Sequence, residues 1–265
     1  MKRYLLILLA GAAFSADCNH VTEHVNNETA GAEKKSDDFY HYSIWTALVN
    51  KVFDGNLTVA EGKTKGDIGL GTYNGADGEL IMLDGIMYHV PSTGVVEVAN
   101  DSTHIPYLNA TFFDKDYSYE LSGQLNYDTV RKMIQQHFPS RNYFYAFKIH
   151  ADLDSLKLGS LYKQKKPYPL GLDVLMPDRP KFDHGAISGT MVGFYCPDYI
   201  GDINVAGFHL HFLSDDKKVG GHVMEFKGHQ FDVEMDKLAS YHLVLPEATD
   251  FDSVNLEKKF QYGKK

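Results

Sequence analysis

Apolar residues begin to recur at regular spacing near Phe39, after a polar N-terminal stretch. Their helical spacing predicts one helix over 41–53 and a second over 127–138, the latter ending before Pro139. Between them, short apolar runs broken by Asn-Gly and Asp-Gly pairs predict hairpin-like strands over 68–90. The pattern therefore indicates strands joined by short turns, with few helices.

The second half of the chain continues this pattern. Further strands are predicted at 142–153, 186–197, 208–214, 220–228 and 229–236. The proline-punctuated segment 165–180 is predicted to be irregular. Strands outnumber helices and follow one another through short turns, which predicts an α+β fold with mixed, largely antiparallel β-sheets.

Composition supports a folded protein and excludes some partners. The chain of 265 residues is 43% hydrophobic, which suits one large domain or two small, closely packed ones. Its formal net charge of −9 argues against nucleic acid or an anionic membrane surface as a partner, because both attract clustered Lys and Arg.

The first residues have the pattern of a targeting segment. Lys2 and Arg3 precede the apolar run 4–14, which is too short to be a stable membrane anchor and is typical of a secretory signal. We therefore predict a signal peptide over 1–15 and an exported protein, periplasmic or extracellular.

Residues 16–38 are polar and predict a flexible tether, followed by a single folded region over 39–265. Cys18 lies just beyond the predicted cleavage site. A membrane becomes a partner only if Cys18 is lipid-modified, and Asp17 fits poorly the small residue expected before such a cysteine.

Three histidines in one predicted hairpin carry the strongest chemical signal. His209 and His211 alternate in a strand and therefore point to the same face. A hairpin whose turn is centred between Asp216 and Lys217 places His211 directly opposite His222. Three imidazoles would then converge, and three histidines with an open position form a recurring catalytic zinc site.

The ordinary alternative is that two alternating histidines in a strand have no functional meaning. The third histidine, which lies in the mirrored position of the hairpin, favours metal binding instead. Motifs for a serine hydrolase elbow, a phosphate-binding loop or a dinucleotide site are absent from the sequence. A metal-dependent reaction is therefore the chemistry that the sequence predicts.

Several blocks of the chain, in order, resemble the α-acetolactate decarboxylase family. The hairpin "GFHLHFLSDDKKVGGHV" resembles the family's zinc-binding hairpin, and the similarity extends over about residues 39–256. The other similar blocks are 42–55, 66–88, 142–149, 163–169 and 189–212. The resemblance implies two closely packed subdomains. It also implies a homodimer, an expectation that no other feature of the sequence supports.

The resemblance also implies a ligand set and a reaction. It assigns His209, His211, His222 and Glu79 to a Zn²⁺ ion, with Glu79 also catalytic, and Thr72 to a hydroxyl on the substrate side. The implied substrate is 2-acetolactate or a related 2-hydroxy-3-oxo acid, which loses CO₂ to give acetoin. Zinc would stabilise the developing negative charge as a Lewis acid, without an organic cofactor.

Two departures from the family pattern predict impaired activity. Gly159 stands where the family has a substrate-holding arginine, and a glycine offers neither charge nor donor. Lys157 would share a face with residue 159 and partly replace the arginine, unless it is an ordinary solvated lysine. The family's late glutamate has no clear counterpart either, because Glu257 comes too early.

Two alternatives follow from these departures. A zinc hydrolase of esters or lactones would not need the arginine, since zinc-bound water can attack a carbonyl. The other is a catalytically inactive secreted binding protein on the same scaffold.

Overall fold

The structure is a computed structural model, and it describes residues 20–24 and 37–257. The predicted signal peptide over 1–15, Cys18 and most of the predicted tether lie outside these residues. Within the predicted tether, strand β1 (His20–His24) pairs antiparallel with β10 (Tyr117–Asn126). Among the residues that the structure describes, no helix is long and apolar enough to cross a membrane.

The first of two large sheets has seven strands, and every pairing in it is antiparallel. In spatial order the strands are β1, β10 (Tyr117–Asn126), β15 (Gly220–Leu238), β14 (Gly207–Ser214), β13 (Ile187–Cys196), β11 (Phe144–Gly159) and β12 (Lys181–His184). Because β11 also pairs with β15, the strands β11, β13, β14 and β15 close into a ring.

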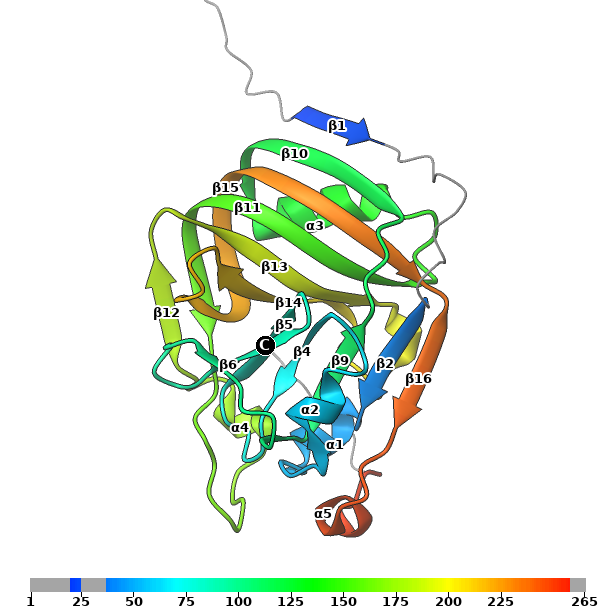
Figure 1. Cartoon of the computed structure of the whole chain (residues 1–265), viewed down its shortest axis with the longest axis vertical. Coiled ribbons are helices and arrows are strands. Elements are labelled where there is room, and N and C mark those ends of the chain that lie inside the picture. The colour runs from blue at the N-terminus through cyan, green and yellow to red at the C-terminus, as the bar shows by residue number, and fades with distance from the viewer. Residues whose placement is uncertain (1–19, 25–36, 258–265) are drawn as a thin grey trace, which may run out of the picture.

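The second large sheet also has seven strands and lies against the first (Figure 1). Its order is β16 (Ser240–Val244), β2 (Asp38–Tyr42), β9 (Tyr107–Thr111), β4 (Ile68–Thr72), β5 (Glu79–Leu83), β6 (Ile86–Val90) and β7 (Glu97–Val98). Only the pairing of β16 with β2 is parallel. A small third sheet pairs β3 (Leu57–Thr58) with β8 (His104–Ile105).

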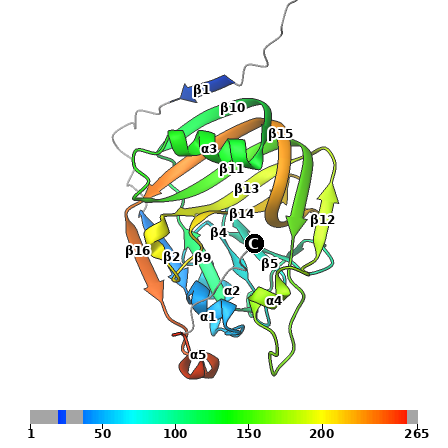
Figure 2. The same ribbon diagram turned by 180° about the vertical axis from the view of Figure 1, so that it is seen from behind.

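The helices are short. They are α1 (Trp45–Val49), α2 (Val59–Gly62), α3 (Tyr127–Gln136), α4 (Leu172–Leu175), α5 (Thr249–Ser253) and the 3₁₀ turn Asp198–Ile200. The Asn126 side chain caps α3 by accepting a hydrogen bond from the Thr129 amide. Val130 and Ile134, four residues apart, form the buried side of the helix. The helix α3 therefore covers the face of the first sheet that is turned away from the second sheet (Figure 2).

A hydrophobic core fills the space between the two large sheets. Ile68, Leu70 and Ile81 of the second sheet belong to the same buried cluster as Val192 and Phe194 of the first. This packing fixes the position of β4 and β5 relative to the histidine-bearing strands β14 and β15. The prediction of an α+β fold with largely antiparallel sheets is confirmed.

Two element predictions were wrong in detail. The helix predicted over 41–53 is reduced to α1, because residues up to Tyr42 pair with β9 and β16 and Ser43 turns the chain with φ +71°. The strands predicted at 220–228 and 229–236 are one strand, β15. Gly228 does not interrupt it; a Cβ there would lie 2.6 Å from the Asp152 carbonyl oxygen, so the glycine permits close approach of β11.

Candidate active site

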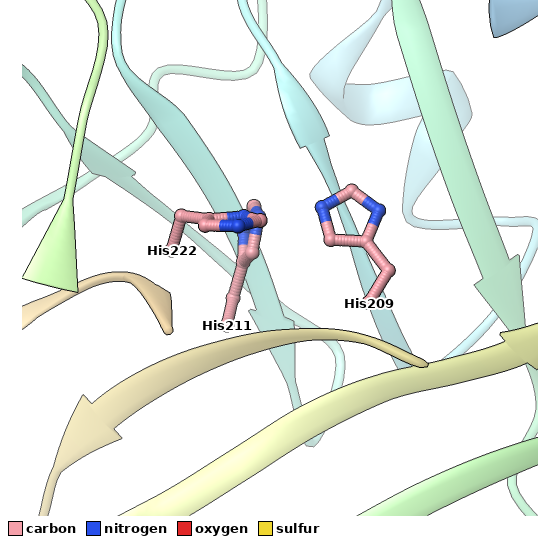
Figure 3. Close-up of side chains that lie close together, drawn as sticks. All are labelled: His209, His211 and His222. Carbon is pink, nitrogen blue, oxygen red and sulfur yellow. The ribbon is translucent and has the colours of Figure 1, made fainter. Parts of the chain in front are cut away.

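The three histidines converge where β14 meets β15. The predicted register is confirmed, since His211 pairs directly with His222. One ring nitrogen from each of His209, His211 and His222 lies within 4.8 Å of the other two, which is compatible with a shared metal ion. Figure 3 shows the three rings turned toward one another. Their centroids lie 5.0–5.4 Å apart.

The hydrogen bonds around the histidines leave lone pairs for a metal. His211 Nδ1 lies 2.8 Å from the Leu80 carbonyl oxygen, and because a carbonyl only accepts, Nδ1 carries the proton. The Nε2 lone pair of His211 is then free, and neither this atom nor His209 Nδ1 has a hydrogen-bond partner although both are buried. Buried polar atoms without partners are rare, so this donor set fits a metal ion.

Burial also keeps the imidazoles neutral. It lowers the pKa of His211 to about 4, an effect that the nearby Arg179 guanidinium reinforces and the Leu80 hydrogen bond opposes. Burial lowers the pKa of His209 and His222 well below the ordinary value, and the neighbouring histidines lower it further. Neutral imidazole is the metal-binding form of histidine, so the cluster is ready to bind near pH 7.

Glu79, at the start of β5, approaches this cluster from the opposite sheet. Its Oε2 lies 3.4 Å from His211 Nε2, and the side chain is buried. Burial raises the pKa of Glu79 to about 8, while Arg179 lowers it. The structure therefore places Glu79 beside His211, in the wall of the cavity that all three histidines line.

Thr72, at the end of β4, lies in the wall of the same cavity. Its Oγ1 donates a 2.7 Å hydrogen bond to the Gly78 carbonyl oxygen. The hydroxyl proton is thus already used in a hydrogen bond to the turn that precedes Glu79. A ligand in the cavity can only donate to Thr72, not accept from it.

The cavity itself has a volume of about 180 Å³ and lies between the two large sheets. Much of its wall is apolar, contributed by Trp45, Leu48, Leu161, Leu172, Met176 and Phe208. Pockets that bind drug-sized ligands have volumes of roughly 300–1,000 Å³, so this cavity suits a smaller molecule. It combines a metal-ligand cluster with an apolar wall, the usual composition of a small-molecule site.

Lys157 does not reach the cavity. Its Nζ lies 3.4 Å from Glu225 Oε2 and 4.0 Å from Asp183 Oδ1, in a separate open groove. Gly159 does face the site, because it pairs with His222. Glu257 is exposed and is not part of the cavity wall.

Arg179 is the cavity residue that the sequence reasoning missed. It follows α4 in the segment predicted to be irregular, and its side chain forms part of the cavity wall. Its charge acts on Glu79 and on all three histidines. One signal was available, since Arg179 is the only arginine that follows Arg141 in the sequence.

Comparison with known proteins agrees with this geometry. The family model described as alpha-acetolactate decarboxylase matches residues 39–258. The alpha-acetolactate decarboxylase of Methanosarcina mazei is 33% identical over 226 residues, covering 85% of this chain and 78% of that protein. The Bacillus licheniformis enzyme of the same name is also 33% identical, with 85% and 89% covered.

A solved structure agrees as well. The crystal structure of alpha-acetolactate decarboxylase from Bacillus subtilis strain 168 superposes with a TM-score of 0.81 at 32% identity, covering 83% of this chain and 94% of that chain. The family match and these relatives span the sheets, the histidine cluster and the cavity. This chain therefore belongs to the alpha-acetolactate decarboxylase family of carboxy-lyases.

Proposed function

We propose that this protein decarboxylates 2-acetolactate, or a closely related 2-hydroxy-3-oxo acid, to acetoin and CO₂ with the help of a zinc ion. The observation that carries the proposal is the convergence of three neutral histidines and Glu79 on one small cavity in a chain of this family. Histidine nitrogens and carboxylate oxygens are among the usual ligands of zinc in proteins.

His209, His211 and His222 would hold the ion, and Glu79 would complete the protein ligands. When bound, zinc supplies a Lewis acid that stabilises the negative charge developing on the substrate's oxygens as CO₂ leaves. The apolar wall keeps bulk water away from that charge, which strengthens every polar contact inside the cavity. Burial raises the pKa of Glu79 because it disfavours the charged carboxylate, and a cation bound beside that carboxylate would offset the penalty.

Acetoin release from racemic acetolactate by the zinc-loaded protein tests the proposal. We expect release well above the rate in buffer, and its loss after chelation with recovery on adding zinc. His222→Ala should abolish both zinc binding and release. His229→Ala is the matched control, because His229 lies on the same strand but is exposed and bonded to Asp154. Release no faster than in buffer would refute the proposal.

Decarboxylation is better supported than ester or lactone hydrolysis. The hydrolase alternative drew on the absence of a cation at residue 159, yet the cavity contains the guanidinium of Arg179. A panel of simple esters and lactones should therefore be hydrolysed no faster by the zinc-loaded protein than by its chelated form. Metal-dependent ester cleavage without acetoin release would favour the hydrolase instead.

We also propose that the protein is exported after cleavage near residue 15. The basic and apolar pattern of residues 1–15 supports this proposal. Mass spectrometry of the mature N-terminus would test it, with Cys18→Ser as the control for lipid attachment. An uncleaved chain retained in the cytoplasm would contradict it.

A further inference from the structure

Gly159 lies in a row with two of the histidines. Gly159 of β11 pairs with His222 of β15, and His222 pairs with His211 of β14. Residues directly opposite one another in antiparallel strands point to the same face. A side chain at residue 159 would therefore point toward the histidine cluster.

Arg179 occupies the space that such a side chain would need. A Cβ built on Gly159 would lie 3.1 Å from Arg179 Nε and 3.3 Å from Arg179 Cδ. Both contacts are tighter than ordinary van der Waals contact, so the arginine packs directly onto the bare backbone of Gly159. The glycine thus leaves room for a cation that comes from elsewhere in the chain.

The Arg179 guanidinium is short of partners within the protein. Its Nε is buried and has no hydrogen-bond partner. Within the part of the chain that the structure describes, the guanidinium makes no ion pair with a carboxylate. Burial lowers the pKa of Arg179, and the charge of Glu79 acts on it only from a distance by raising that pKa. A partly buried cation that lacks a counter-anion is unfavourable, and an anionic ligand would remove that penalty.

We propose that Arg179 binds the carboxylate of the substrate in this cavity, taking the place of the arginine that is missing at residue 159. The inference rests on the proposed function, which supplies a small carboxylate as the ligand. Arginine suits the role because its planar guanidinium can donate two parallel hydrogen bonds to a carboxylate. Lys157 is excluded, because its ammonium group pairs with Glu225 outside the cavity.

Binding measurements on the zinc-loaded full chain separate this role from a structural one. The probe is the reduced analogue of acetolactate, in which an alcohol replaces the ketone, so that the carboxylate is kept but decarboxylation is blocked. A second probe is the corresponding diol without the carboxylate. Arg179→Met should weaken binding of the analogue roughly 10- to 100-fold, the usual effect of losing a charge-assisted contact. Binding of the diol should change little.

The affinity of Arg179→Lys for the analogue should lie between those of the wild type and Arg179→Met, because lysine keeps the charge but not the paired donors. Arg141→Ala is the matched control, since Arg141 is exposed and lies outside the cavity. Zinc content and the circular dichroism spectrum should be unchanged in all three variants. In acetoin assays the loss in Arg179→Met should be mainly a higher KM.

Failure of the inference can be told apart from failure of the proposed function. If the wild type neither releases acetoin nor binds the analogue, the proposed function fails. If the wild type does both and zinc-bearing Arg179→Met binds the analogue as tightly, the inference alone is overturned.

A swap of the two residues gives a second test. Gly159→Arg alone should reduce binding of the analogue, because two arginine side chains would compete for one space. The double variant Gly159→Arg, Arg179→Gly should bind it better than Arg179→Gly alone. If the double variant folded and bound zinc but bound the analogue no better than Arg179→Gly, the claim that either position can supply the guanidinium would be overturned.

Discussion

The Leu80 carbonyl oxygen accepts a hydrogen bond of 2.8 Å from Nδ1 of His211, and this contact joins the two large sheets at the histidine cluster. Leu80 follows Glu79 on β5, so the same short segment supports one proposed ligand through its backbone and supplies another through its side chain. Groups that hold the second nitrogen of a metal-bound histidine commonly change metal affinity by roughly 10- to 100-fold.

Two substitutions at His211 separate the sheet contact from the metal contact. The amide nitrogen of His211→Asn can take the place of Nδ1 and keep the Leu80 bond, whereas His211→Gln places its amide nearer Nε2 and loses that bond. Both variants should lose most of their zinc affinity. Without metal, the Asn variant should have the higher free energy of unfolding, by about 0.5–1.5 kcal/mol, which is the usual net contribution of one hydrogen bond.

Urea unfolding in the presence of a chelator measures that difference between the two His211 variants. Zinc titration of the same samples provides the second readout. Equal stability of the two variants would contradict a structural role for the Leu80 bond.

Thr72 should act chiefly through the turn before Glu79. Thr72→Val keeps the shape of the side chain but leaves the Gly78 carbonyl without its donor, at a cost of about 1–3 kcal/mol. Because Gly78 immediately precedes Glu79, zinc affinity should fall as well. Thr72→Ser keeps the hydroxyl and should restore most of both. Denaturant midpoints and zinc titration of both variants measure these effects. If Thr72→Val were as stable as the wild type and bound zinc as tightly, the role of Thr72 would be limited to contact with the substrate.

Gly193 should be essential for the position of His209. A Cβ at Gly193 would lie 2.0 Å from the His209 carbonyl oxygen, so alanine must push β14 away from β13. Overpacking of this kind typically destabilises by about 1–3 kcal/mol, and displacement of His209 should weaken zinc binding. Gly185→Ala is the control, because a Cβ there meets nothing within 4 Å. If Gly193→Ala matched Gly185→Ala in both stability and zinc affinity, this packing argument would be wrong.

The histidine cluster could be predicted from sequence because its geometry is local. Alternation along a strand aligns His209 with His211, and the position of a tight turn fixes which residue faces His211 across the hairpin. Glu79 was reached only through family resemblance. Its approach to His211 depends on how the two sheets pack, which no local pattern encodes.

The cation of the site could not be predicted in the same way. Lys157 was the candidate because it alternates with Gly159, but the pairing of β11 with β15 shifts register at Lys157 and places it opposite Glu225. Arg179 reaches the cavity through a segment with almost no regular structure, so neither period-two nor helical spacing indicates where its side chain points. What the sequence did contain was a glycine where a cation was expected, and that glycine marks the space that Arg179 fills.

Asp236 should make the protein less stable at alkaline than at mildly acidic pH. It is fully buried on β15; its Oδ2 accepts a 3.0 Å hydrogen bond from the Asp114 amide, while Oδ1 has no partner. Burial, with smaller contributions from Asp116, Asp37 and Asp114, raises its pKa to about 7. An unfolded chain has an Asp pKa of about 3.9, so between about pH 4 and pH 7 the folded state binds more protons and stability falls as the pH rises.

Replacing Asp236 with Asn should remove this dependence, because the amide stays neutral and keeps an oxygen for the Asp114 amide. Relative to the wild type, Asp236→Asn should gain on the order of a few kcal/mol between pH 5 and pH 8. Urea unfolding of both proteins at the two pH values measures the gain. Asp232→Asn, an exposed change on the same strand, should track the wild type. If Asp236→Asn also ran parallel to the wild type, Asp236 would not be the group whose ionisation destabilises the fold.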